Sequence, residues 1–105
     1  MSYQELASQL KVLSDASRLE IIDLLSCGEL CACDILAHFD FSQPTLSHHM
    51  KALVACGLVT ARKEGTKRMY QLNAEKFEGI DHTLNYLHTN NEVCICKTMK
   101  GGTCS

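Results

Sequence analysis

The spacing of hydrophobic residues predicts that the first part of the chain is helical. Leu6, Leu10 and Leu13 recur three and four residues apart, so we expect a first helix over about residues 3–14. Capping residues follow, and then a second, more deeply buried helix. Arg18 lies in its first turn, where the helix dipole disfavours a cation, so we expect an acidic partner for this side chain. The apolar residues of the second helix are Leu19, Ile21, Ile22, Leu24 and Leu25.

A short helix, a turn and a longer helix come next. Gly28 ends the second helix, and a short third helix runs up to a tight turn at residues 40–41. Ser42 is a good N-cap for a fourth helix, and Pro44 falls in its first turn, where a missing N–H costs nothing. This order of elements predicts a helix-turn-helix. The apolar residues of the third helix are Ile35, Leu36 and Phe39.

The fourth helix has a buried side and a polar side. At about 100° per residue, His49 falls near the flank of the buried stripe, while the outward residues are types that reach base edges and phosphates in a major groove. An ordinary solvent-exposed helix has the same polar side. The expected buried residues are Leu46, Met50, Leu53 and Val54. The candidate DNA contacts are Gln43, Thr45, Ser47, His48, His49 and Lys51.

Two short extended segments predict a β-hairpin after this helix. Gly57 closes the helix, and residues 58–63 and 67–72 flank a turn that contains Gly65. A basic hairpin directly after a helix-turn-helix is a wing, and the combination is more specific than either part. The basic residues near its tip are Arg62, Lys63, Lys67 and Arg68.

A last helix and a polar tail complete the chain. Asn73 can cap this helix, whose narrow apolar stripe is typical of a helix that pairs with another helix. The stripe packs either on its own domain or, as so small a chain favours, against a two-fold partner. We expect one domain over residues 1–88 and a mobile, cysteine-containing tail over residues 89–105. The stripe consists of Phe77, Ile80, Leu84 and Leu87.

Charge is distributed unevenly along the chain. The formal net charge is −2, yet residues 42–70 carry +4 and residues 1–41 carry −5, with the histidines counted as neutral. A basic block inside an acidic protein is the footprint of a phosphate-facing surface, or otherwise of an ordinary solvated face.

The composition also limits the compartment and the class of protein. No apolar run reaches membrane-spanning length, and Glu5 stands where a secretory signal would be basic, so we expect a soluble, cytoplasmic protein. Seven cysteines without a secretion signal indicate reduced thiols, and therefore metal binding or redox chemistry. We find no nucleophile with a base and an orienting group, so we expect no enzyme and no organic cofactor.

Cys31 and Cys33 lie one residue apart at the expected start of the third helix. Residues at this spacing point to nearly opposite sides of a regular helix, so the two thiols can share an ion most easily where the backbone is irregular, as in a first helical turn. Free N–H groups and the helix dipole favour thiolate there, the form that binds soft metals. The alternative is that both are small buried residues.

Two motifs, together with the basic hairpin, carry a family resemblance. ELCACD at residues 29–34 and SQPTLSHH at residues 42–49 resemble the ArsR/SmtB family of metal-sensing winged-helix repressors, and the similarity spans about residues 3–88. The resemblance implies a mainly α, winged helix-turn-helix fold with a small β-hairpin. It also implies a homodimer joined by the first and last helices, which leaves operator DNA when arsenite or antimonite binds.

The resemblance assigns roles to residues as well. Cys31 and Cys33 would be thiolate ligands, and Lys51 and the four basic residues of the hairpin would contact phosphates. Arsenic and antimony in the trivalent state prefer three thiolates, and Leu36 stands where some arsenite sensors have a third cysteine. Solvent or a small external thiol is one source of the third ligand, and the tail thiols also suffice for a separate site. The candidate protein ligands are Cys27, Cys94, Cys96 and Cys104.

Other readings remain open at this point. The same DNA-binding module is compatible with soft divalent metals (cadmium, lead or zinc) or thiol oxidation as the signal. A zinc site on the last helix is disfavoured, because Asp81, His82 and His88 do not reproduce the spacing of the family's zinc sensors. A different class, a small thiol enzyme or a metal-storage protein, would fail to bind DNA at low salt.

Overall fold

The computed structural model describes residues 1–89. The three cysteines of the predicted tail, Cys94, Cys96 and Cys104, lie outside the described residues, as does nearly all of that tail. The elements confirm the predicted mainly α fold with a helix-turn-helix and a β-hairpin. Their order is α1 (Tyr3–Leu13), α2 (Ala16–Leu25), β1 (Leu30–Cys31), α3 (Ala32–His38), α4 (Gln43–Ala55), β2 (Val59–Glu64), β3 (Lys67–Leu72) and α5 (Ala74–His88).

Short polar side chains fix where the helices begin. Ser2 accepts a hydrogen bond from the backbone N–H of Glu5, and Asp15 accepts one from Arg18, each at 3.1 Å. Ser42 accepts from Thr45 at 3.4 Å at the start of α4. These bonds satisfy backbone donors that have no partner inside the helix. Asn73 occupies the N-cap position of α5 without a capping side-chain bond.

The core lies between α4, α2 and the sheet. Most of the residues predicted to be buried in α2 and α4 are buried or half-buried, but two are exposed. Leu19 is 53% exposed, because it projects from the side of α2 opposite Ile21 and Leu25. Val54 is 37% exposed, because it lies at the edge of the buried stripe of α4 and lines an open cavity. The core consists of Leu6, Ile21, Leu25, Ile35, Leu46, Met50, Leu53, Leu58, Val59, Tyr70 and Ile80.

The hairpin is part of a three-stranded antiparallel sheet with the order β1-β3-β2. Its turn contains Gly65 at φ +63°, a conformation that glycine adopts without strain. β1 pairs Leu30 with Tyr70 and Cys31 with Met69. The sequence does not predict this strand, since two residues are too few to show a period.

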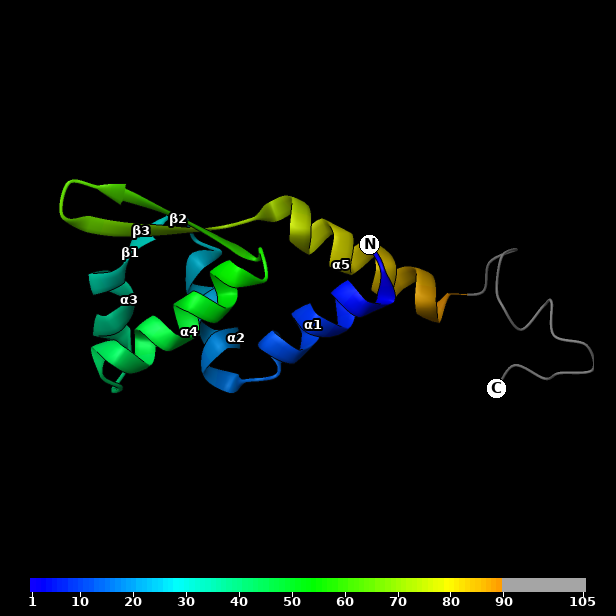
Figure 1. The fold of residues 1–105 in the computed structure, drawn as a ribbon, viewed down its shortest axis with the longest axis horizontal. Helices are drawn as coiled ribbons and strands as arrows, with labels where there is room; N and C mark the ends of the chain where they lie inside the picture. Colours follow the sequence, from blue (N-terminus) through cyan, green and yellow to red (C-terminus); the bar gives the residue numbers. More distant parts are fainter. Residues whose placement is uncertain (90–105) are drawn as a thin grey trace, which may run out of the picture.

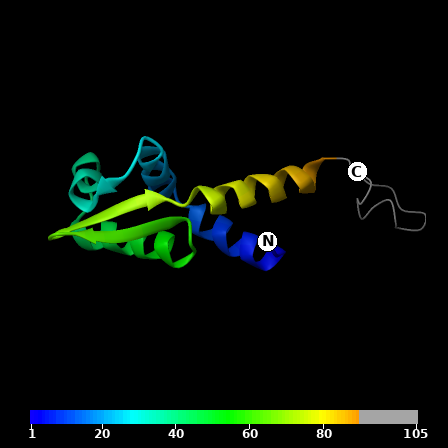
Figure 2. The ribbon, with the colours of Figure 1, turned by 90° about the horizontal axis from the view of Figure 1, so that it is seen from above.

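The elements form a body and an extension (Figures 1 and 2). The body contains α2, α3, α4 and the sheet, and the tip of the hairpin projects at one end. At the other end α1 and α5 run side by side, where Lys76 donates to Glu5 at 3.1 Å. Within residues 1–89, no helix is long and apolar enough to cross a membrane.

Two neighbouring residues of α4 test this description of the core. We expect Leu53→Ala to lower the free energy of unfolding by about 3 kcal/mol, because it leaves a cavity where a side chain is fully buried. Val54→Ala is the matched control and should cost less than about 1 kcal/mol. Urea unfolding at one fixed protein concentration measures both, and equal losses would contradict the assigned faces of α4.

Candidate thiolate site and nucleic-acid interface

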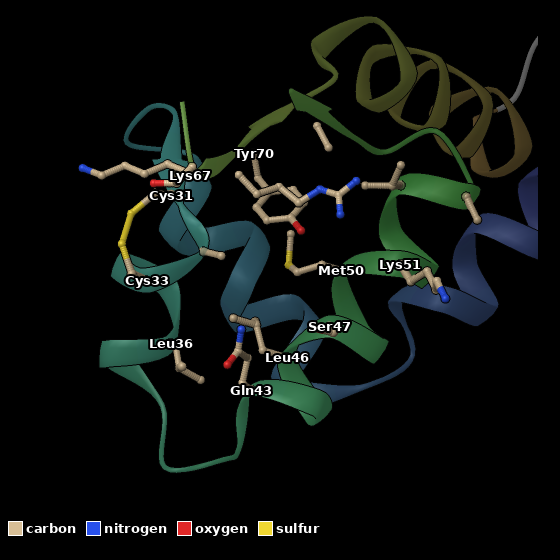
Figure 3. Close-up of a pocket in the computed structure, with 16 residues that line it drawn as sticks. Cys31, Cys33, Leu36, Gln43, Leu46, Ser47, Met50, Lys51, Lys67 and Tyr70 are labelled. Atoms are coloured by element: carbon tan, nitrogen blue, oxygen red, sulfur yellow. A yellow bond between two sulfur atoms is a disulfide. The ribbon is translucent and has the colours of Figure 1, made fainter. Parts of the chain in front are cut away.

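Cys31 and Cys33 meet at the junction of β1 and α3. Cys31 is the last residue of β1 and the N-cap of α3, with extended φ and ψ of −82° and 160°. This irregular start places the Cα atoms of the two cysteines 5.4 Å apart, and the structure joins their sulfurs as a disulfide (Figure 3). The predicted position of the pair at a helix start is confirmed. In the reduced form the same backbone keeps both thiols within reach of one ion.

A backbone donor and the start of a helix face one sulfur of the pair. The Sγ atom of Cys31 accepts a hydrogen bond from the N–H of Asp34 at 3.3 Å, and it lies at the positive end of α3. Cys31 is 4% exposed, whereas Cys33 faces solvent. A carboxylate oxygen of Asp34 and the two sulfurs lie within 4.8 Å of one another. Trivalent arsenic prefers three thiolate ligands. The group supplies two of them, because its third ligand atom is a hard carboxylate oxygen and not a sulfur.

The remaining described cysteines lie outside this group. Cys27 is exposed and is not among the residues brought together with Cys31 and Cys33. Cys56 is half-buried, and its thiol donates to the carbonyl oxygen of Leu53 at 3.4 Å. Cys56 therefore packs at the end of α4, and within residues 1–89 no third thiol is grouped with Cys31 and Cys33.

The thiol segment is joined directly to the wing, the β2–β3 hairpin. Besides the pairing of Cys31 with Met69, Arg62 of β2 donates two hydrogen bonds to the carboxylate of Glu29, at 2.6 and 2.9 Å. Arg62 also contacts Glu64 at 3.1 Å. The Arg62 hydrogen bonds lower the pKa of Glu29. Arg62, expected to contact a phosphate, is therefore engaged with two carboxylates.

Aromatic contacts join α3 to α4 across the predicted turn. The ring of Phe39 stacks on that of Phe41, with centroids 4.5 Å apart and planes 15° apart. Phe41 in turn contacts the imidazole of His49 in α4 at a centroid distance of 5.6 Å. A displacement of α3 would thus change the contacts of α4.

His49 and Arg18 differ from the sequence expectations. His49 is 9% exposed, and its Nδ1 accepts a hydrogen bond from Nε of Arg18 at 3.0 Å, so its ring faces α2. Arg18 also donates to the carbonyl oxygen of Val12 at 3.2 Å. Asp15 is an acidic neighbour of Arg18, and its pKa is lowered by the hydrogen bond from the Arg18 backbone N–H and further by the Arg18 charge, but no carboxylate in the described chain forms an ion pair with Arg18. Its backbone N–H, not its guanidinium, is bonded to the side chain of Asp15.

The other candidate contacts are exposed on α4 and the wing. They comprise Gln43, Thr45, Ser47, His48, Lys51, Lys63, Lys67 and Arg68. Several of them surround a cavity of about 720 Å³ between α3, α4 and the hairpin (Figure 3). Cys31 and Cys33 line the same cavity, which thus brings the thiols and the polar side of α4 together. No local sequence pattern predicts this cavity, because its walls come from segments far apart in the chain.

Comparisons with known proteins fit this geometry. A model of bacterial regulatory proteins of the arsR family matches residues 15–61. The arsenical resistance operon repressor of Staphylococcus xylosus is 64% identical over 104 residues, which cover 99% of this chain and 100% of the relative. The chain belongs to the arsR family. The repressor of the same name from Staphylococcus aureus is 62% identical, with the same coverage.

Solved structures of arsR-family proteins support the fold. An ArsR-like regulator from Rhodococcus has a TM-score of 0.73 at 32% identity and covers 80% of this chain and 79% of its own. A DNA-binding domain from Mycobacterium bovis, described as a homodimeric winged helix-turn-helix, has a TM-score of 0.63 at 30% identity. It covers 84% of this chain and 89% of its own. The predicted winged-helix transcriptional repressor is confirmed, and the enzyme and storage-protein readings fall away.

The buried imidazole makes stability depend on pH. Burial lowers the pKa of His49 below 6.5, although Asp15 opposes this effect. The unfolded chain therefore binds a proton more readily, so neutral His49 stabilises the fold above pH 6.5 and this contribution is lost as the pH falls through 6.5. We expect the free energy of unfolding to fall from pH 7.5 to 5.5 more steeply in the wild type than in His49→Gln. His48→Gln, at the exposed neighbour, should keep the wild-type slope, and an unchanged slope in His49→Gln would contradict this assignment.

Proposed function

We propose that this protein represses an arsenic-resistance operon in the cytoplasm by binding operator DNA as a homodimer, and that it leaves the DNA when arsenite or antimonite binds Cys31 and Cys33. The observation that carries the proposal is the position of Cys31, which belongs at once to the sheet of the wing and to the first helix of the helix-turn-helix. The names of the two relatives above 60% identity support an arsenical as the inducer class.

The inducer site consists of the two thiolates at the start of α3. A trivalent arsenic or antimony ion, when bound, accepts up to three thiolate sulfurs. Cys31 and Cys33 supply two, and the Asp34 N–H holds the first sulfur in place. The protein candidates for a third ligand remain Cys27, Cys94, Cys96 and Cys104; Cys27 lies outside the described group.

The DNA-binding surface combines α4 with the wing. Residues on the outward side of α4 would enter the major groove and contact base edges: Gln43, Thr45, Ser47 and His48. Basic residues beside them would contact phosphates: Lys51, Lys63, Lys67 and Arg68. His49 positions α4 through Arg18, and Arg62 holds the wing to Glu29.

The homodimer would form through α1 and α5. Large apolar side chains of both helices are exposed on the single chain: Tyr3, Leu10, Leu84, Tyr86 and Leu87. Burial of such residues between two copies would stabilise the dimer. The M. bovis domain, described as homodimeric, supports the formation of a homodimer.

Two routes lead from the thiols to the DNA surface. Cys31 is paired with Met69, next to Arg68 of the wing. At the other end of α3, Phe39 reaches α4 through Phe41 and His49. A shift of the α3 start therefore changes the positions of both DNA-reading parts. A coupling of about 1–3 kcal/mol between inducer and DNA is enough for useful derepression.

Replacement of both thiols tests the inducer site. We expect Cys31→Ser/Cys33→Ser to bind operator DNA as the wild type does and to lose release by arsenite, because hydroxyls are poor ligands for a soft ion. Fluorescence anisotropy of labelled operator DNA measures both properties. Cys56→Ser is the matched control and should keep normal release. Release by arsenite from the double variant would place the inducer site elsewhere.

The salt dependence of binding tests the DNA surface. Lys51→Gln should reduce the slope of log affinity against log salt by about one for each protomer, because one phosphate contact is lost. Lys11→Gln removes the same charge from α1, outside the proposed surface, and should leave the slope unchanged. A slope that both variants alter equally would mean that the protein's net charge, rather than α4, determines affinity.

Thiol oxidation is a second candidate signal, favoured by the disulfide between Cys31 and Cys33 in the structure. Soft divalent metals are a further alternative, since a relative from S. aureus, 40% identical over 72 residues, is named a cadmium resistance regulatory protein. The DNA-release assay separates the three signals. If peroxide or cadmium released the DNA and arsenite did not, the inducing signal would be oxidation or a divalent metal and not an arsenical.

A further inference from the structure

The thiolate site is incomplete within the described chain. It contains two soft sulfurs and the hard carboxylate oxygen of Asp34, whereas a trivalent arsenic ion prefers three sulfurs. Cys33 is exposed, and both cysteines line the cavity between α3, α4 and the wing. A ligand in this cavity would therefore lie close enough to Cys31 and Cys33 to supply the third sulfur.

The inner wall of the cavity is apolar. In Figure 3, the disulfide and Leu36 lie on one side of the space, and residues of α4 lie on the other. At about 720 Å³ the cavity is in the range of small-molecule sites and exceeds what a metal ion needs. Its apolar lining includes Ala32, Leu36, Leu46, Met50, Val54 and Ala61.

The rim of the cavity is basic and polar. Lys51 lies on α4, and Lys67 and Arg68 lie on β3, so cations come from two walls. Hydrogen-bonding groups between them come from Gln43, Ser47 and Thr66. Among residues 1–89, no carboxylate lines this cavity, although Asp34 and Glu64 lie beside a neighbouring hollow. A ligand that fits this lining has an apolar body and negatively charged ends.

We propose that the cavity binds a low-molecular-weight thiol that carries carboxylates, and that the sulfur of this thiol is the third ligand of the inducer ion. The inference rests on the proposed inducer site at Cys31 and Cys33. The carboxylates would bind Lys67 and Arg68, because charge-assisted hydrogen bonds to a carboxylate are strong. Lys51 of α4 also lines the cavity.

The binding step balances without a change of oxidation state. Arsenous acid, As(OH)₃, reacts with the thiols of Cys31 and Cys33 and with one external thiol. Three As–S bonds form, three As–O bonds break, and each hydroxide leaves as water with a thiol proton. The protein takes part in its reduced, dithiol form.

This arrangement gives the bound thiol a direct effect on DNA binding. Gln43, Ser47 and Lys51 line the cavity and belong to the proposed DNA surface. A thiol held against these side chains would compete with DNA for them. The inducer would thus act by occupation of the DNA surface as well as by a shift of α3.

Equilibrium dialysis of the reduced, full-length protein against radiolabelled glutathione tests the proposal without DNA. With equimolar arsenite we expect about one glutathione to be retained per protomer, and none without arsenite or in Cys31→Ser. Lys67→Gln/Arg68→Gln should weaken retention about tenfold or more, because two charge-assisted contacts are lost. Lys63→Gln, in β2 outside the cavity, is the matched control and should retain glutathione as the wild type does.

A thiol without carboxylates distinguishes the contribution of the sulfur to binding from that of the carboxylates. Labelled 2-mercaptoethanol should be retained equally by the wild type and by Lys67→Gln/Arg68→Gln, which also shows that the double variant still binds arsenite. Equal loss of glutathione in Lys63→Gln and in the double variant would overturn the role of the cavity rim.

The proposal and the proposed function fail in different ways. X-ray absorption counts the sulfurs around arsenic. Three sulfurs in a wild-type protein that retains no glutathione would overturn the proposal that the third ligand is an external thiol, and would assign a tail thiol instead. The arsenite-responsive repressor would survive that result. Absence of arsenic binding to Cys31 and Cys33 would overturn both.

Discussion

The backbone pairing of Cys31 with Met69 is the contact on which the rest of the site depends. This pairing holds a nearly buried thiol at the edge of the sheet, while the same residue caps α3. A ligand on its sulfur therefore acts on a residue that three elements already hold in place. In the proposed mechanism, the change reaches the wing and the helix-turn-helix together, because a close-packed interior does not absorb it locally.

The position of α4 depends on polar and aromatic contacts as much as on its apolar stripe. Its buried imidazole accepts the hydrogen bond from Arg18, and Phe41 packs on the same ring. An unpaired buried guanidinium or imidazole would cost several times what an ordinary hydrogen bond contributes. The pair therefore favours one orientation of α4 relative to α2, and that orientation sets the direction of the outward side chains.

One surface carries both of the protein's proposed ligands. The basic and polar residues that suit phosphates and base edges also surround the cavity beside the thiols. The cavity opens between α4 and the wing. A small anion in the cavity and the phosphates of DNA would therefore bind the same positively charged side chains. Competition of this kind requires no long path through the protein, whereas the route through Phe39 and Phe41 requires a displacement of α3.

The sequence by itself determined the elements and the motif. Helical spacing, the capping residues at Asp15 and Ser42, and the glycine in the hairpin turn are local signals, so five helices, the turn and the wing could be predicted from short stretches. The motif at residues 29–34 also placed the thiols at a helix start. Only the tertiary structure decided that Cys31 joins the sheet, that His49 faces Arg18, that Arg62 binds Glu29 and that a cavity adjoins the thiols. Each of these features joins residues more than 30 positions apart, and no local period or cap records which distant segment will pack against which.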